Sequence, residues 1–150
     1  MIELLRGIGR RFRRLLGRDG ADAPHLRVGR LGEDAAVRCL KRKGYTILER
    51  NFTVRQGEVD VVAFRDGTVA FVEVRTQTAP ARIDPAETIT RRKQRRVIKA
   101  ARQYSTLHDL ERENVLLRFD AVLVLLDDGG RPQSVEHIED AFQAPTAAGF

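Results

Sequence analysis

The feature that most constrains the fold is a succession of three strand-like segments with no helix between them. They cover residues 45–52, 58–64 and 69–75, each rich in β-branched or aromatic residues. Asp66-Gly67, between the last two, is typical of a tight hairpin turn, and Gln56-Gly57 predicts a turn between the first two. We therefore expect neighbouring strands of one sheet, the last two of them antiparallel.

Helical periodicity is present on both sides of these strands. Before them, apolar residues share one helical face over residues 28–40, and Gly44 stands where that helix would end. After them, Pro85 and Glu87 predict the start of a long helix that ends near Leu107. Acidic residues would then lie near the positive end of its dipole.

The remaining segments complete an α/β pattern. Residues 116–126 are the most hydrophobic run and predict a strand central to the sheet. The Asp-Asp-Gly-Gly sequence at 127–130 predicts a turn, followed by a short strand at about 134–138 and a short helical end. The order α-β-β-β-α-β-β predicts a mixed β-sheet flanked by helices, in a single domain over residues 25–150.

Length and cysteine content exclude several classes of protein. A chain of 150 residues needs neither a metal nor a disulfide to fold, because roughly 70% of its unfolded surface can be buried. The single cysteine, Cys39, lies on an apolar helical face, which indicates core packing and a reducing compartment. The longest apolar run, 121–126, has six residues, whereas a membrane-spanning helix needs about 20. We expect a cytoplasmic protein without stable membrane insertion.

Basic residues gather in two segments of a chain whose formal net charge is +6. Residues 91–102 hold seven basic residues and no acid. Residues 1–24 hold six arginines among apolar residues at helical spacing, which predicts a basic arm that is flexible or amphipathic. Two basic segments on a mildly acidic body are the electrostatic footprint of a polyanion-binding protein. A solvated helix surface explains the same charge run equally well.

Two carboxylates on the second and third strand segments form a candidate site. Counted outward from the hairpin turn, Asp60 and Glu73 stand at equal distances, so we expect them to be neighbours across the sheet. Alternation places Val59 and Val61 together on the face opposite Asp60. Both acids are embedded among apolar residues, where an unpaired carboxylate is costly to desolvate. The compensating cation is either a divalent metal or, in the alternative, Arg75.

A third acid, Glu33, lies on the first helix beside Gly32, where another backbone can approach closely. Convergence of Glu33 with Asp60 and Glu73 would create a metal site of carboxylate oxygens. Such ligands suit Mg²⁺ or Mn²⁺ far better than zinc. An exposed helical glutamate is the alternative for Glu33.

Other polar residues receive no catalytic assignment. His25, His108 and His137 are scattered and lack the paired spacing of metal ligands. Asp120, at the start of a buried strand, is expected to make a structural hydrogen bond or to pair with Arg118.

Seven short motifs follow one another in an order that resembles a known family. They are Gly32-Glu33, Gly44-Tyr45, Asn51-Phe52, Gly57-Glu58-Val59-Asp60, Phe71-Val72-Glu73-Val74-Arg75, Arg92-Lys93-Gln94 and Arg118-Phe119-Asp120. The series resembles the YraN family of small bacterial proteins, over roughly residues 28–143. That family is similar in turn to Holliday-junction resolvases of the PD-(D/E)XK nuclease superfamily, so the resemblance implies a restriction-endonuclease-like core.

The resemblance also implies roles for individual residues. Asp60 resembles the metal-binding aspartate, Glu73 the acid of the (D/E)XK element, and Glu33 the helix-borne acid that assists metal binding. Arg75 occupies the lysine position of that element, and Gln77 stands where a further basic residue is common. Arginine stays protonated and is no general base, but it can orient water and stabilise charge on a phosphate.

The resemblance thus predicts a metal-dependent nuclease with Asp60, Glu73 and Arg75 as catalytic residues and Mg²⁺, replaceable by Mn²⁺, as cofactor. The substrate would be DNA or structured nucleic acid, with DNA favoured over RNA. Junction-resolving relatives often dimerise, so a homodimer is one expected assembly. Two alternatives stay open: a non-catalytic nucleic-acid-binding protein on a nuclease-like scaffold, and an interaction or membrane adaptor acting through residues 1–18. The expected nucleic-acid contacts are Arg91, Arg92, Lys93, Arg95, Arg96 and Lys99.

Overall fold

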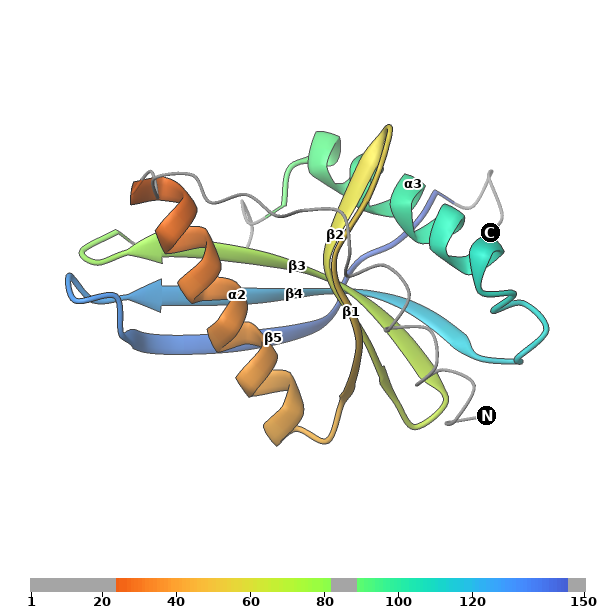
Figure 1. Ribbon diagram of the computed structural model, residues 1–150, viewed down its shortest axis with the longest axis horizontal. Helices are drawn as coiled ribbons and strands as arrows, with labels where there is room; N and C mark the ends of the chain where they lie inside the picture. Colours follow the sequence, from red (N-terminus) through yellow and green to blue (C-terminus); the bar gives the residue numbers. More distant parts are fainter. Residues whose placement is uncertain (1–23, 82–88, 146–150) are drawn as a thin grey trace.

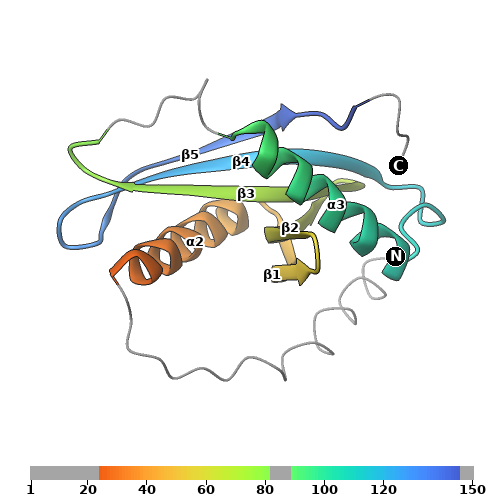
Figure 2. The same cartoon turned by 90° about the horizontal axis from the view of Figure 1, so that it is seen from above.

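The computed structural model describes residues 24–81 and 89–145 and shows a five-stranded mixed sheet with two helices (Figures 1 and 2). The observed order confirms the predicted α-β-β-β-α-β-β pattern of an α/β fold. The elements are α2 (Pro24–Arg42), β1 (Thr46–Val54), β2 (Gly57–Arg65), β3 (Thr68–Thr78), α3 (Arg91–Leu107), β4 (Leu116–Leu126) and β5 (Pro132–Phe142).

The strands lie in the order β1-β2-β3-β4-β5. Only β3 and β4 run parallel, and α3 lies in the connection between them, as a parallel pair requires. β3, rather than β4, is the central strand; β4 is the next strand along, between β3 and β5. β4 is nevertheless buried over most of its length, whereas β3 is buried over its first half and partly exposed beyond Glu73.

Alternate side chains of β3 and β4 enter two separate apolar clusters, one for each helix. Phe71 and Phe119 pack with Tyr104 of α3, whereas Val72 and Val122 pack in the cluster of α2. The two helices therefore cover opposite faces of the sheet. Cys39 is buried within α2.

β2 changes direction at Asp60, which the alternation did not predict. Val61 packs in the α2 cluster, but Val59 packs in the α3 cluster, so the two side chains do not share a face. Pairing of β2 with β3 ends at Val61↔Val72, while pairing with β1 continues to Gly57. The β1–β2 hairpin thus leaves the sheet and lies beside α3 (Figure 2).

Gly57 explains how the hairpin and α3 come so close. A Cβ at this position would stand 2.1 Å from the carbonyl oxygen of Arg96, a separation that real side chains do not adopt. The turn before Gly57 is Arg55-Gln56, so the predicted Gln56-Gly57 turn is shifted by one residue. This glycine is used for helix–strand packing and not for the turn.

The backbone angles confirm the predicted hairpin turn at Asp66-Gly67 and the predicted helix end at Gly44. Asp66 and Gly67 have φ values of 49° and 74°, as a two-residue type I′ hairpin requires. Gly44, just after α2, has φ of 88°, the left-handed conformation that commonly ends a helix.

Helix α3 begins at Arg91, later than predicted. Thr90 is its N-cap, with extended backbone angles and a side-chain oxygen that accepts a hydrogen bond from the Lys93 amide. No acid lies in the first turn that begins at Arg91. Pro85 and Glu87 lie outside the described residues.

The chain ends differ from expectation where they are described. β5 continues to Phe142, and residues 143–145 are not helical, so the described part of the predicted helical end is absent. The predicted basic arm lies outside the described residues, apart from Pro24, which begins α2. None of the described helices is both long and apolar enough to span a bilayer.

Candidate functional site

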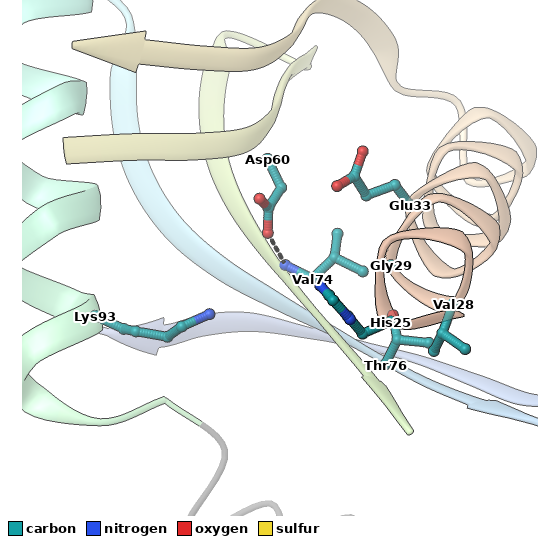
Figure 3. A pocket seen from close by; sticks show the side chains of 8 residues that line it. All are labelled: His25, Val28, Gly29, Glu33, Asp60, Val74, Thr76 and Lys93. Atoms are coloured by element: carbon teal, nitrogen blue, oxygen red, sulfur yellow. Dashed lines mark hydrogen bonds between the residues drawn. The ribbon is translucent and has the colours of Figure 1, made fainter. Parts of the chain in front are cut away.

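A cavity of about 400 Å³ opens where β2 leaves β3 (Figure 3). β3 continues beyond its last β2 partner and stays paired with β4 as far as Thr78. The β3 edge that β2 vacates therefore faces the cavity, with α2 on one side and the start of α3 on the other. The lining residues are His25, Val28, Gly29, Glu33, Asp60, Val74, Thr76 and Lys93.

Asp60 lines this cavity and has a pKa far above its ordinary value. Its Oδ2 accepts a hydrogen bond of 2.7 Å from the Val74 backbone N–H (Figure 3). Burial and, second, the negative charge of Glu73 raise the pKa of Asp60 to about 8, although the Val74 hydrogen bond lowers it. The described residues thus place too little positive charge near this carboxyl to offset its burial and the negative charge of Glu73.

Glu73 lies next to Asp60 and has a cation of its own. Its side chain is 3% exposed, and its Oε1 is 2.6 Å from the Lys93 ammonium. Thr90 sets the start of α3, and Lys93 projects from the first turn of this helix. The position of the helix start therefore decides which basic residue reaches the strands. Sequence reasoning assigned Lys93 to nucleic-acid contact, but the structure places it against Glu73.

Glu33 lines the same cavity from α2 but is held toward β1. Its Oε2 accepts a hydrogen bond of 3.1 Å from the Asn51 amide and lies 3.7 Å from Arg50. The predicted close approach at Gly32 is confirmed, because a Cβ there would lie 1.8 Å from Thr76 Oγ1. Over residues 24–81 and 89–145, no three acidic, histidine or cysteine side chains form a ready-made metal cluster.

Arg75 has a different position from the one that the ion-pair alternative requires. It is half-buried on β3, does not line the cavity, and has no hydrogen-bond or ion-pair partner among the described residues. The cation on Glu73 is Lys93 instead. Sequence reasoning could not find this contact, because it depends on how α3 is rotated against the sheet.

The other predicted nucleic-acid residues of α3 form an exposed basic surface. The buried residues of the helix, among them Val97, Ala101 and Tyr104, face the sheet, and the cations face solvent. Within this surface Arg96 pairs with Glu58 at 3.4 Å. The exposed members are Arg91, Arg92, Arg95, Arg96 and Lys99.

A second polar cluster surrounds Asp120, which is fully buried on β4. Arg118 donates to both carboxylate oxygens at 2.7 and 2.8 Å, confirming the expected pair. His137 Nε2 lies 2.8 Å from Oδ2, and the Asp140 amide donates to Oδ1 at 3.0 Å. Burial raises the pKa of Asp120, but the hydrogen bonds from His137 and Arg118 outweigh it and hold the pKa below its usual range.

This cluster continues to the protein surface through Tyr45. Arg118 donates to the Tyr45 hydroxyl at 2.6 Å, and that hydroxyl donates to Glu139 at 2.8 Å. Sequence reasoning missed His137, because only the β4–β5 register, with Val122 opposite His137, brings it to Asp120.

Comparison with known proteins gives one consistent family. Residues 32–124 match the model of the uncharacterised protein family UPF0102. A UPF0102 protein of Myxococcus xanthus is 43% identical over 85% of this chain and 98% of its own length. UPF0102 proteins of Trichlorobacter lovleyi and Chlorobium limicola are 46% and 40% identical, over 77% and 82% of this chain and 89% and 96% of their own lengths. The matched region includes Glu33, Asp60, Glu73 and Lys93.

Proposed function

The chain belongs to the uncharacterised protein family UPF0102, and we propose that it is a metal-dependent nuclease that hydrolyses phosphodiester bonds of DNA. One observation carries the proposal: Asp60, whose pKa the negative charge of Glu73 helps to raise, lines the cavity at the open edge of β3 together with Lys93, which pairs with Glu73. Lys93 stands at the start of an exposed basic helix. This arrangement combines groups that bind cations with a surface that attracts a polyanion.

The donor set fits Mg²⁺ or Mn²⁺. Asp60 has one backbone N–H and a neighbouring negative charge, so a divalent cation would supply the positive charge that its carboxylate lacks. Asp60, Glu73 and the Val74 carbonyl would hold the ion directly, and Glu33 would reach it through water. When bound, the ion supplies Lewis acidity toward a phosphate and lowers the pKa of its water.

In this proposal, basic residues of the chain hold the Glu73 carboxylate and contact the DNA backbone. Lys93 fixes the Glu73 carboxylate and places a positive charge inside the cavity, where a phosphate would approach. Arg75 lies on the same strand as Glu73 but does not line the cavity, so the proposal gives it no contact with that phosphate. Arg91, Arg92 and Arg95 contact the neighbouring DNA backbone, which positions the strand without reading its sequence.

The test is a cleavage assay with Mg²⁺ and Mn²⁺ on duplex, flap and four-way-junction DNA. We expect cleavage only with metal, and a loss of more than about a hundredfold in the Asp60→Ala/Glu73→Ala protein, because the ion's charge stabilisation is worth several kcal/mol. Arg131→Ala, an exposed change in the β4–β5 turn, is the matched control and should cleave normally. Chelator-resistant cleavage, or full cleavage by the double variant, contradicts the proposal.

A second function, DNA binding without cleavage, is favoured by one specific observation. Lys93 already neutralises Glu73, and an arginine stands where the superfamily's lysine is expected. Under this alternative, charge reversal at Arg95 and Arg96 weakens DNA binding, whereas Asp60→Asn leaves binding intact and there is no cleavage to lose.

A further inference from the structure

A second cavity, of about 320 Å³, lies between the β1–β2 turn and α3. Its lining contains three basic residues and two glutamines but no acid. The turn and the helix are joined here, since Lys99 donates to the Gln56 side chain at 3.2 Å. The lining residues are Val54, Arg55, Gln56, Lys99, Arg102 and Gln103.

The strand β2 connects this cavity to the acidic one along the side of α3. Asp60 lies at one end of the path, and Glu58 and Gly57 follow it against Arg96. Because Glu58 is paired with Arg96, its charge is neutralised and does not interrupt the basic path. From Asp60 to Gln56 an extended strand covers about 13 Å. From Lys93 to Lys99 the helix rises about 9 Å.

We propose that the cavity between the β1–β2 turn and α3 binds one backbone phosphate of the DNA strand that places another of its phosphates at Asp60 and Glu73. The inference rests on the proposed function and adds a second contact point for the same strand. One strand of B-DNA advances about 3.4 Å per nucleotide along the helix axis but also winds around that axis, so its successive phosphates are roughly twice that far apart. Two phosphates separated by about 9–13 Å therefore lie about two nucleotides apart.

The chemistry of the lining fits a phosphodiester. Arg55 can bind two phosphate oxygens at once, and Lys99 contributes a compact charge. The side-chain amides of Gln56 and Gln103 supply neutral donors of the kind that contact phosphates in DNA complexes. None of these groups reads a base, so the cavity sets the position and direction of the strand rather than its sequence.

This second contact makes the site sensitive to strand length on one side. A DNA strand that ends less than about two nucleotides from the phosphate at Asp60 leaves the cavity at Lys99 empty. Such a substrate loses affinity, whereas one extended on that side keeps it.

The experiment is a phosphate-interference scan in EDTA, so that binding is measured without cleavage. Single methylphosphonates, which remove one charge, are placed along one strand of a labelled duplex, and affinity is read by fluorescence anisotropy. Wild type is compared with Lys99→Ala, Arg55→Ala and Lys93→Ala, and with Arg131→Ala as the control.

We expect Lys99→Ala and Arg55→Ala each to weaken binding about fivefold, and each to lower the slope of log affinity against log salt by about one. One methylphosphonate position should weaken binding of wild type but not of Lys99→Ala, and another should weaken binding of wild type but not of Lys93→Ala. These two positions should lie about two nucleotides apart. Arg131→Ala should behave as wild type. Unchanged melting temperatures would show that the variants fold.

Several outcomes overturn the inference. Equal affinities of Lys99→Ala and Arg131→Ala would do so, as would one interference position common to Lys93 and Lys99. Loss of binding to phosphatidylserine vesicles in Lys99→Ala with unchanged DNA affinity would assign the cavity to a membrane surface instead. This experiment measures binding and not cleavage. If the wild type fails to cleave DNA in the separate cleavage assay, the proposed nuclease function is contradicted, but the binding data still test the second phosphate contact.

Discussion

Asp60 and Asp120 are carboxylates within the same sheet, and the protein treats them in opposite ways. Asp120 receives a guanidinium, an imidazole and a backbone amide, and its pKa is lowered. Asp60 receives one backbone amide and lies beside Glu73, and its pKa is raised to about 8. The difference shows that a buried carboxylate becomes structural when its partners are complete and becomes a candidate binding group when they are not.

Each cluster also differs in access. The side chains of Asp120 and His137 are fully buried, so no ligand reaches them without unfolding. Asp60, by contrast, lines an open cavity with Glu33 and Lys93. Of these two carboxylates, Asp60 alone combines access with missing positive charge, which is why we place the function there.

The largest effect on stability is expected for a substitution at Asp120, the carboxylate whose hydrogen-bond partners are complete. Asp120→Ala should lower the free energy of unfolding by about 3–5 kcal/mol, because the buried His137 imidazole loses its hydrogen-bond partner and Arg118 keeps only Glu139 as its ion-pair partner. Urea denaturation followed by circular dichroism measures this change. A loss below about 1 kcal/mol would contradict the view that these contacts hold β4 and β5 together.

Asp60→Asn should raise the free energy of unfolding, the opposite of Asp120→Ala, and by a smaller amount. The folded protein binds the Asp60 proton up to about pH 8 while the unfolded chain releases it near the ordinary 3.8, so stability falls as pH rises through that window. Asparagine removes this dependence and should stabilise the protein by about 1–3 kcal/mol above pH 8.

Urea titrations of wild type and Asp60→Asn at pH 5, 7 and 9 test this prediction. The two curves of stability against pH should separate as pH rises. Parallel curves would mean that Asp60 ionises normally, and the contrast with Asp120 would disappear. Asp120 itself contributes stability that is lost only when pH falls below about 4, since its folded pKa is depressed.

The smallest effect is expected at Lys93, whose side chain is 38% exposed. Lys93→Met should destabilise the protein by about 1 kcal/mol, because Glu73 loses its cation while water screens part of the change. Mn²⁺ should then restore stability more in Lys93→Met than in wild type, since Glu73 is free to bind the ion.

Thermal unfolding with and without Mn²⁺ measures that rescue. Arg95→Met, which removes an equal charge from the exposed surface of the same helix, is the control and should gain no extra stability from Mn²⁺. Equal rescue in both variants would show that Lys93 and the ion do not meet at Glu73.

Much of the site was predictable because it depends on local chemistry. The Asp66-Gly67 turn sets the hairpin register, and that register brings Asp60 toward Glu73. Glu33 follows from its place beside Gly32, where the helix approaches Thr76. What was not predictable is the bend at Asp60, because it results from packing of the hairpin on α3 through Gly57.

The order of the elements, the carboxylate pair near the hairpin and the basic surface of α3 are properties of the amino-acid sequence by itself, since turn residues, alternation and charge are local. Only the tertiary structure decided that Lys93, and not Arg75, neutralises Glu73, and that His137 completes the partners of Asp120. The reason is that helix rotation and strand register determine which charges share a buried environment, and segments far apart in the chain set both.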